Sequence, residues 1–581
     1  MQIIVVDNRT IQLSQLFEGQ SEIVNKHFSV RDPNAFYSAA MRNRKWDGYY
    51  RKFNTYTQTM SKAFIGELIE LCKEHDFPYE IVDNRPKTKF PRPSVGTFDE
   101  TLIEGITLRP HQMRALNASC ISDDPIADLI SEYGIHKHKT GAGKTEMICG
   151  IIKLFRCPTV IITEQVVVLD QIVERLKLRN VVHNNDIGMF CSGLTPTNNL
   201  VIVGSTASIQ NPIKPKLSNI EVKTETVVKE FDSLYANRKD ELKEIIGVNS
   251  YNAIVSAYAS SNDSLISEAL EKPLMRLSLL MKKKYFDAAL KGYYTLIEKT
   301  TIIQELIKKC ELLLVDECDK GSSDLYEILY KELFLGRYVY GFSGTPFDDD
   351  VPVQNMTVKE RFGSVISESS RAELEAIGAI QPVKYYMVQH GRMAKDAKDA
   401  FDVAERAEIT ENVEFHKRVK QITDSFPDDG TLILVDTLEI EGLGLALEKI
   451  IPGSVFIYNK TPKSKRDKAI KDFENRTIKV LIGSKIVKRG LDLKGGCENL
   501  IICGGGKRSS NFDQMIGRAV RLTKRGFSRV WDFYFTGNYY LINHSRKRLK
   551  YIVAMGYKTV VLIGGKQIDG PEFVKKKYKL M

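Results

Sequence analysis

The sequence predicts an α/β protein with two tandem parallel-sheet domains, a small α+β domain before them and a helical insertion in the first. Short runs rich in valine and isoleucine recur along the chain and alternate with stretches of helical character. Strands that are apolar at nearly every position are buried on both faces, which is typical of a parallel sheet covered by helices. The runs form two sets separated by a gap, so we expect two domains of this kind.

The expected strands of the first set are residues 159–163, 200–205, 312–316 and 338–343. Those of the second set are residues 431–437, 454–459, 479–484, 499–504 and 529–535. Residues 134–138 make a poor strand by the same criterion. Several of the strands end in a small or polar residue, and ligands of open α/β sheets bind at the carboxyl ends of the strands.

Changes in pattern along the chain suggest the domain boundaries. Residues 1–95 have their own mixed pattern and end in a basic, proline-rich linker, so we expect an accessory domain there. We assign residues 96–380 to the first α/β domain and residues 381–540 to the second. Residues 210–308, approximately, lie between two strands of the first set. This stretch is far longer than a usual connection, so we interpret it as a helical insertion. Residues 541–581 are expected to form a basic C-terminal extension.

Composition excludes several classes of protein. The 581 residues include 84 Lys or Arg and 73 Asp or Glu, which gives a net charge of +11. Residues 541–581 hold ten of the former and two of the latter, which suggests a polyanion partner or a solvated basic tail. The nine cysteines form no CxxC pair, and no apolar run reaches the roughly 18 residues of a membrane span. We therefore expect a cytosolic protein.

A glycine-rich stretch is the sharpest motif. It comprises Thr140, Gly141, Ala142, Gly143, Lys144 and Thr145, followed by helix-prone residues. Glycines let backbone N–H groups approach phosphate oxygens, while Lys144 would reach the terminal phosphates and the Thr145 hydroxyl would bind Mg²⁺. The general pattern has glycine where this chain has His138, and a chance glycine-rich turn is the alternative.

Two further sequences complete a phosphoryl-transfer site. The buried run 312–316 ends in Asp316 and Glu317, which suit a metal ligand and a base for the attacking water. In the second domain, Gln514, Arg518 and Arg521 lie on one expected helix, and arginines three apart share a face. Guanidinium groups there could stabilise transition-state charge on a triphosphate held by the first domain.

Together these motifs resemble the superfamily 2 helicases and translocases over roughly residues 100–540, which implies RecA-like domains, ATP and Mg²⁺. Residues 140–145, 316–319, 343–345 and 514–521 look like motifs I, II, III and VI. Arg109 and Gln112 are similar to the adenine-reading element, and Gly490 and Asp492 to the end of motif V. Cys318, Asp319 and Arg489 depart from the better-known patterns.

A narrower resemblance, to the phage UvsW-type recombination helicases, begins with residues 44–51. Arg44 and Lys45 precede Trp46, Asp47 and Gly48, which look like the NWDG element of that family's small N-terminal domain. The resemblance implies remodelling of branched DNA with 3′ to 5′ translocation. Basic residues mixed with aromatic ones suit nucleic acid, although for Trp46 we favour a role in the domain core.

Residues at strand ends and in the basic C-terminus are candidates for contacts with nucleic acid. The hydroxyl side chains at strand ends are Thr163, Ser205, Thr206, Thr437 and Ser484. Arg546 and Arg548, with the lysines at 575–577, could hold a duplex arm. We expect a monomer whose partner is single-stranded, forked or four-way-junction DNA, and other recombination or replication proteins are candidate partners. The alternatives are a duplex translocase subunit of a restriction-type system, an RNA helicase, and a non-hydrolysing nucleotide-binding module.

Overall fold

The computed structural model describes residues 1–163, 166–191, 194–210, 212–348, 350–391, 399–484, 496–506, 516–517, 523 and 525–575. Contacts divide the chain into two compact units. One comprises residues 190–195 and 207–306, and the other comprises residues 1–189, 196–206 and 307–581.

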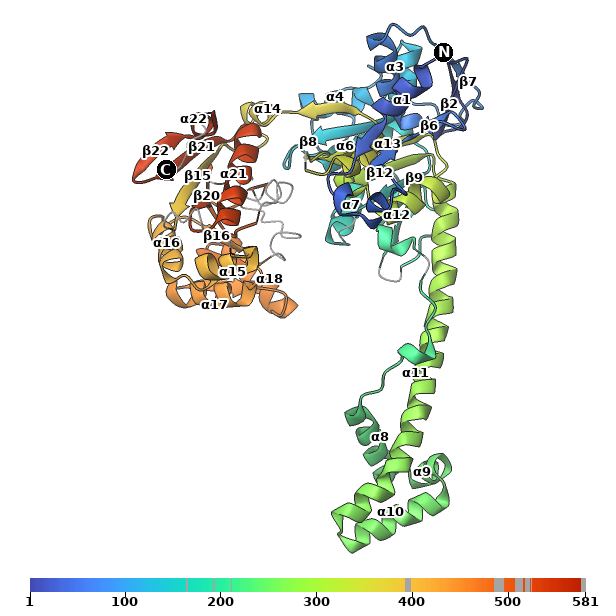
Figure 1. Ribbon diagram of the computed structural model, residues 1–581, viewed down its shortest axis with the longest axis vertical. Helices are drawn as coiled ribbons and strands as arrows, with labels where there is room; N and C mark the ends of the chain where they lie inside the picture. The colour runs from blue at the N-terminus through green and yellow to red at the C-terminus, as the bar shows by residue number, and fades with distance from the viewer. Residues whose placement is uncertain are drawn as a thin grey trace. The chain divides into compact units, whose positions relative to one another are not determined.

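The larger unit begins with a small α+β domain (Figure 1). Its sheet has the order β5-β6-β2-β1-β7, with strands Gln2–Val5 (β1), Thr10–Ser14 (β2), Phe53–Asn54 (β5), Thr59–Ser61 (β6) and Glu80–Asp83 (β7). Strand β1 pairs antiparallel with β2 and parallel with β7. Helices Gln20–His27 (α1) and Ile65–Glu74 (α3) contribute to its apolar core, which includes Ile3, Val24 and Leu68. A separate hairpin of Ser29–Arg31 (β3) and Tyr49–Arg51 (β4) flanks the short helix Ala39–Arg42 (α2).

The first large sheet has the order β10-β11-β9-β12-β13-β8-β14. Its strands are Tyr133–His138 (β8), Thr159–Ile162 (β9), Ile187–Phe190 (β10), Val201–Gly204 (β11), Leu312–Asp316 (β12), Tyr338–Ser343 (β13) and Val365–Ser369 (β14). Strand β12 pairs parallel with β9 and β13, and β8 pairs parallel with β13 and β14. The expectation of a poor strand at 134–138 is wrong, because β8 lies inside this sheet.

Helices surround this sheet and connect its strands. They are Pro110–Ala118 (α4), Pro125–Ile130 (α5), Lys144–Phe155 (α6), Val166–Leu178 (α7), Asp324–Ile328 (α12), Pro352–Phe362 (α13) and Arg371–Ala376 (α14). Helix α7 contacts β11, and α13 contacts β8 and β13. The strands between them are buried on both faces, as the sequence predicts.

The second large sheet has the order β17-β18-β16-β19-β20-β15-β21-β22. Its strands are Val383–His390 (β15), Thr431–Val435 (β16), Ser454–Ile457 (β17), Val480–Gly483 (β18), Asn499–Cys503 (β19), Ser528–Phe535 (β20), Lys558–Ile563 (β21) and Lys566–Asp569 (β22). Only β22 runs antiparallel to its neighbour among the pairs that the described residues form. This domain's helices are Phe401–Glu405 (α15), Val413–Asp424 (α16), Ile440–Ile450 (α17), Lys463–Glu474 (α18), Tyr539–Ala554 (α21) and Gly570–Lys575 (α22). Two tandem parallel-sheet domains confirm the predicted fold class.

The basic C-terminal residues do not form a separate extension. Strands β21 and β22 belong to the second large sheet, where β21 pairs parallel with β15. Helix α21 packs on β20 and β21, and α22 packs on β21. The high positive charge of this segment conceals its strand-forming run 558–563.

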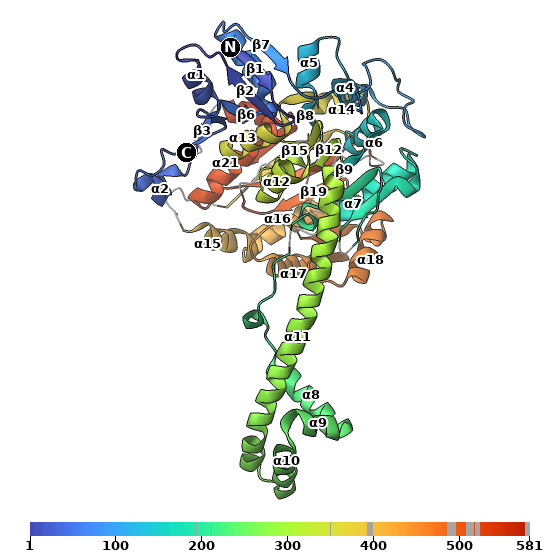
Figure 2. The same ribbon diagram turned by 90° about the vertical axis from the view of Figure 1, so that its right-hand side faces the viewer.

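The smaller unit is helical (Figure 2). Its helices are Thr224–Asn237 (α8), Lys239–Ile246 (α9), Val248–Ser260 (α10) and most of Asp263–Lys308 (α11). Helices α8, α9 and α10 pack on the first part of α11 around a core that includes Phe231, Leu242, Ile254 and Leu277. Helix α11 is one continuous helix in Figure 2.

Candidate functional site

The glycine-rich loop connects β8 to α6. Gly141 and Gly143 have φ values of 89° and 82°, in the left-handed region that favours glycine. Gly143 is the N-cap residue of α6, so Lys144 and Thr145 occupy the first turn of the helix. An added Cβ at Gly143 would lie 2.4 Å from Nε2 of Gln112. The loop therefore requires glycine, and it presents the N-terminal end of a helix, which favours phosphate.

Acidic groups surround the loop lysine. Burial alone would lower the pKa of Lys144, but the carboxyls of Glu317, Asp316 and Asp319 outweigh burial and raise it. Lys144 comes from α6, while the acids follow β12, two strands away from β8 in the sheet. The sheet therefore assembles this cluster from residues that are more than 170 positions apart in the chain.

Burial also acts on the two acids that end β12. It raises the pKa of Asp316 against the opposing effect of Lys144. Burial, reinforced by Asp316 and Asp319, raises the pKa of Glu317 to about 7. Glu317 has φ 57°, a left-handed conformation that is uncommon for a residue with a side chain and that is frequent at functional sites.

The residues fit a magnesium–nucleotide complex. Oδ1 of Asp316 is buried and has no hydrogen-bond partner among the described residues, so this oxygen is available for a cation. In proteins with such a loop, Mg²⁺ is held by one loop hydroxyl, one carboxylate and phosphate oxygens. Thr145 and Asp316 would be the protein ligands here.

A hydrogen bond that the sequence does not reveal connects motifs II and III. The Ser343 hydroxyl at the end of β13 donates to Oδ1 of Asp319 at 3.0 Å. Ser343 Oγ also accepts the backbone N–H of Thr345 at 3.2 Å. Asp319, which departs from the better-known boxes, is therefore anchored to the neighbouring strand.

The adenine-reading element contacts the glycine-rich loop directly. Gln112 Nε2 donates to the carbonyl of Ala142 at 3.2 Å, and its Oε1 accepts the backbone N–H of Arg109 at 2.8 Å. His111 Nε2 lies 2.8 Å from the same Ala142 oxygen, a contact that sequence reasoning missed. The structure thus brings Gln112 and the loop together.

The remaining predicted nucleotide residues lie outside the part of the chain that the structure describes. These are Gly490, Asp492, Gln514, Arg518 and Arg521. Their roles stay predictions.

The hydroxyl residues predicted to hold nucleic acid follow the strand ends but are covered. Each is less than a tenth exposed: Thr163, Ser205, Thr206, Thr437 and Ser484. Oγ1 of Thr437 is buried without a hydrogen-bond partner among the described residues. Direct side-chain contact with phosphate therefore needs local rearrangement at these positions.

The β3–β4 hairpin carries the exposed basic and aromatic side chains. Arg44 and Lys45 are exposed, and so are Tyr49 and Tyr50. The Trp46 indole N–H donates to the carbonyl of Tyr49 at 2.9 Å, and its ring lies 5.1 Å from that of Tyr50. Trp46 does not belong to the core cluster of the domain, so the expectation of a core anchor is wrong. It instead stabilises the hairpin.

The two C-terminal arginines differ. Arg546 is exposed, and its Nε donates to the Tyr534 hydroxyl at 3.2 Å. Arg548 is 1% exposed and pairs with the buried Asp532 through two bonds of 3.0 and 3.1 Å. The predicted contact of Arg548 with nucleic acid is therefore wrong, because a buried ion pair already occupies its guanidinium. Lys575 is described, whereas residues 576–577 are not.

Two family profiles match the chain. The profile described as "Type III restriction enzyme, res subunit" matches residues 105–348, and "Helicase conserved C-terminal domain" matches residues 417–523. The chain belongs to superfamily 2 of the helicases and translocases. Members of this superfamily bind ATP with Mg²⁺ and act on nucleic acid, so this superfamily 2 chain is an NTP-dependent nucleic-acid motor.

Solved structures show likeness at low identity. UvsW of bacteriophage T4 is 11% identical, covering 96% of this chain and 98% of that one with a TM-score of 0.39. Dbp5 of S. cerevisiae, bound to RNA and ADP BeF3, is 15% identical, covering 79% and 91% with a TM-score of 0.43. A DEAD box protein of Methanococcus jannaschii is 13% identical, covering 79% and 98% with a TM-score of 0.35.

A comparison with curated protein sequences finds no match. Among the described helices of this superfamily 2 chain, none is both long and apolar enough to cross a membrane.

Proposed function

We propose that this chain is an ATP-dependent DNA helicase or translocase that remodels branched DNA by fork reversal and branch migration, moving 3′ to 5′. The observation that supports this most directly is the cluster around Lys144, in which partly buried carboxyls end and follow β12 and Oδ1 of Asp316 has no hydrogen-bond partner in the described chain. The choice of DNA rests on the exposed basic and aromatic hairpin and on the UvsW-type element at residues 44–51.

In the proposed reaction, backbone N–H groups of residues 141–145 and the Lys144 ammonium hold the β- and γ-phosphates of ATP. Thr145 and Asp316 would hold Mg²⁺, which would neutralise negative charge on the phosphates. Glu317 orients the attacking water and accepts its proton. Gln112 would release the carbonyl of Ala142 and hydrogen-bond the edge of the adenine base. Gln514, Arg518 and Arg521 approach when the two α/β domains, which are the motor domains of this chain, close.

Closure then couples hydrolysis to movement along DNA. Ligand-driven hinge motion of two domains alternates between closed and open states. Contacts with phosphates hold the strand without reading its sequence. The β3–β4 hairpin would keep hold of a second arm of the branch.

A duplex translocase of the restriction type is the second candidate. The family profile over residues 105–348 and the sequence of residues 343–347 favour it. An RNA helicase and a non-hydrolysing binding module are further alternatives, and the Lys144 cluster argues against the latter, since a pure binder has no need of a base beside the phosphates.

ATP hydrolysis measured with a panel of nucleic acids tests the proposal. The panel holds single-stranded DNA, linear duplex, a model fork, a four-way junction and RNA of matched length. We expect the fork and the junction to stimulate the rate most. Greatest stimulation by linear duplex would select the restriction-type reading, and greatest stimulation by RNA would select the RNA helicase.

A further inference from the structure

A cavity of about 600 Å³ opens where the N-terminal domain meets the first motor domain. It is lined by the turn at residues 7–10, Lys52, strand β6, the short π-helical turn Leu329–Leu333, Leu335 and the end of α13. None of its lining residues belongs to the nucleotide site described above. The cavity therefore has no part in the proposed reaction.

The cavity wall carries more positive than negative charge. Its cationic residues are Arg9, Lys52, Lys331 and Arg361, and its acidic residues are Asp7 and Glu360. Three of the four cations have partners of their own. Lys52 pairs with Glu360 at 2.5 Å, Lys331 pairs with Glu327 at 2.7 Å, and Arg361 donates to the carbonyl of Ser323 at 2.9 Å.

Arg9 is the exception. Its terminal nitrogens, Nη1 and Nη2, are both buried, and neither has a hydrogen-bond partner in the described part of the chain. The guanidinium carbon lies 5.2 Å from the ring centre of Tyr330 and 5.9 Å from that of Phe334. Aromatic faces attract a cation but do not replace the oxygen acceptors that a guanidinium needs. An unmatched buried charge of this kind is costly, so its presence needs an explanation.

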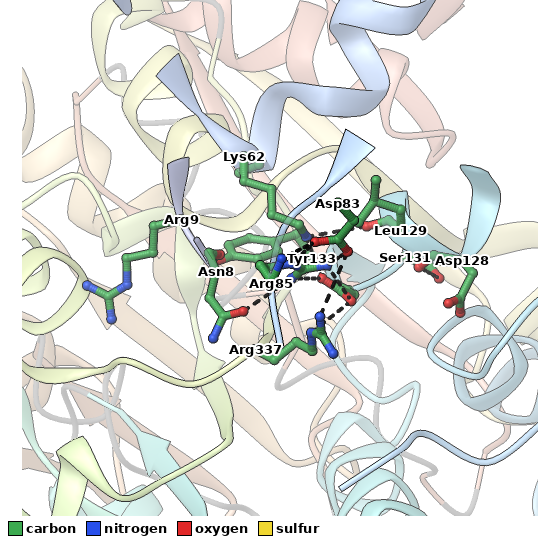
Figure 3. Close-up of polar contacts among 12 residues, drawn as sticks. Asn8, Arg9, Lys62, Asp83, Arg85, Asp128, Leu129, Ser131, Tyr133 and Arg337 are labelled. Carbon is green, nitrogen blue, oxygen red and sulfur yellow. Dashed lines mark hydrogen bonds and ion pairs between the residues drawn. The ribbon is translucent and has the colours of Figure 1, made fainter. Parts of the chain in front are cut away.

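The backbone beside Arg9 is firmly held. The Tyr133 hydroxyl donates to the carbonyl of Asn8 at 2.6 Å, and the Asn8 side chain accepts from Arg85 at 3.2 Å. Arg85 belongs to a buried ion network centred on Glu132, which also pairs with Lys62 at 2.6 Å and with Arg337 at 3.2 Å. Figure 3 shows Asn8 directed toward this network and Arg9 directed away from it.

Buried cations near this turn differ in their partners. Around Glu132 every buried cation meets a carboxylate, so the fold can neutralise arginine and lysine here where neutralisation is needed. One residue along the same turn, Arg9 faces the cavity without a carboxylate ion partner among the described residues. An anchored cation of this kind is preorganised for an external anion.

We propose that this cavity is a binding site for a phosphate group, with Arg9 as its principal ligand. The planar fork of a guanidinium matches two phosphate oxygens, and the ammonium of Lys331 on the same wall adds a second positive charge. The phosphate could belong to a nucleic-acid backbone or to a free nucleotide or inorganic phosphate. The site would then hold its ligand between the N-terminal domain and the first motor domain.

The test uses the full-length chain with Lys144→Ala, which removes phosphate binding at the nucleotide site and makes the result independent of hydrolysis. Melting temperature is measured against inorganic phosphate at constant ionic strength balanced with chloride. We expect phosphate to raise it, and Arg9→Gln to weaken the phosphate affinity about tenfold or more, since charge-assisted hydrogen bonds are lost. Lys26→Gln, an exposed charge change in the same domain, is the matched control and should keep the affinity.

In chloride without phosphate, Arg9→Gln should melt at the same or a higher temperature, because an unmatched buried charge is removed. Leu335→Glu offers a second variant: this exposed residue lines the cavity, and a carboxylate there should repel phosphate. The proposal is overturned if phosphate stabilises Arg9→Gln or Leu335→Glu as much as the parent.

Two further probes identify the source of the phosphate. Binding of oligothymidine and of deoxythymidine monophosphate is measured with the parent and with Arg9→Gln. Weakening for the oligonucleotide assigns the site to a nucleic-acid backbone. Weakening for the mononucleotide and inorganic phosphate alone assigns it to a free phosphate ligand.

Discussion

Glu317 follows the buried strand β12 in a left-handed backbone conformation, within the charge cluster of Lys144. Replacement by glutamine keeps the shape of the side chain but removes the base. We expect Glu317→Gln to lower kcat for ATP hydrolysis by roughly 10²–10⁴-fold while ATP still binds. Steady-state hydrolysis and titration with a fluorescent ATP analogue measure the two effects.

Glu327→Gln, in the same domain but paired at the surface with Lys331, is the matched control and should hydrolyse ATP at the parent rate. Retained hydrolysis in Glu317→Gln would remove Glu317 from its proposed role.

Two buried histidines in β8 predict a dependence of stability on pH. Burial lowers the pKa of His136 to about 3, and burial together with nearby cationic groups lowers that of His138 to about 3. Both are neutral in the folded chain and would be protonated in the unfolded chain below about pH 6.5. Their contribution is therefore present above pH 6.5 and is lost as pH falls toward 3, by about 1.4 kcal/mol per pH unit for each histidine.

Melting temperature measured from pH 7 to pH 5 checks this expectation. His136→Gln keeps a polar side chain that can bond Ser119 and Ser367, which His136 contacts at 3.1 and 2.7 Å. We expect a shallower fall in this variant than in the parent. An identical fall would mean that His136 is protonated in the folded state.

Arg546 lies at the surface and Arg548 in the core, so replacing each should have a different effect. Arg548→Ala leaves Asp532 buried and unpaired, so we expect a loss of about 3–5 kcal/mol in stability. Arg546→Ala removes an exposed charge and should reduce DNA affinity with little change in melting temperature. Thermal unfolding and fluorescence anisotropy, applied to both variants, give the comparison. A stable Arg548→Ala with weakened DNA binding would contradict the structural role assigned to Arg548.

At the scale of elements, strands with every position apolar could be predicted and polar ones could not. Residues 312–316 are buried throughout except at Asp316, so their sequence alone indicates a central strand. Strand β8 contains Gly134, His136 and Lys137, and it is central because Ser119, Ser367 and Ser369 satisfy its histidines. Such long-range partners leave no local signal.

The candidate site follows the same rule. The glycine-rich loop and Asp316 with Glu317 are contiguous motifs and could be located from the sequence. Two contacts depend on strand order, which cannot be read from the sequence. They are the hydrogen bond between Ser343 and Asp319 and the contact between His111 and Ala142. The burial of Thr163, Ser205 and Thr437 likewise depends on packing that periodicity does not specify.

The β3–β4 hairpin is the element on which the choice of nucleic acid depends. If Arg44 and Lys45 contact phosphates, affinity should fall less steeply with salt in Arg44→Gln and in Lys45→Gln. The magnitude of the slope of log affinity against log salt concentration should decrease by roughly 0.7–0.9 in each. Binding of a four-way junction measured at several salt concentrations gives the slope. Lys73→Gln, an exposed change on α3 of the same domain, should leave it unaltered. Unchanged slopes in the hairpin variants would remove the hairpin from the DNA interface.

At the scale of the whole molecule, the sequence predicts two motor domains but not how the other segments join them. The N-terminal domain contacts the first motor domain through buried charges such as Lys62 with Glu132, which are distant in sequence. The last strands complete the second sheet. The helical unit interrupts the connection from β11 to β12 and has a core of its own. These joints are set by tertiary pairing and not by local propensity.

We propose that this superfamily 2 chain uses ATP to move branch points in DNA. The most direct measurement follows the regression of a labelled model fork to a four-way junction, with ATP, in the wild-type chain and in Glu317→Gln. We expect ATP-dependent regression by the wild type and none by the variant, although the variant binds the fork equally well. An unregressed fork in the presence of active ATP hydrolysis by the wild type would contradict the claim.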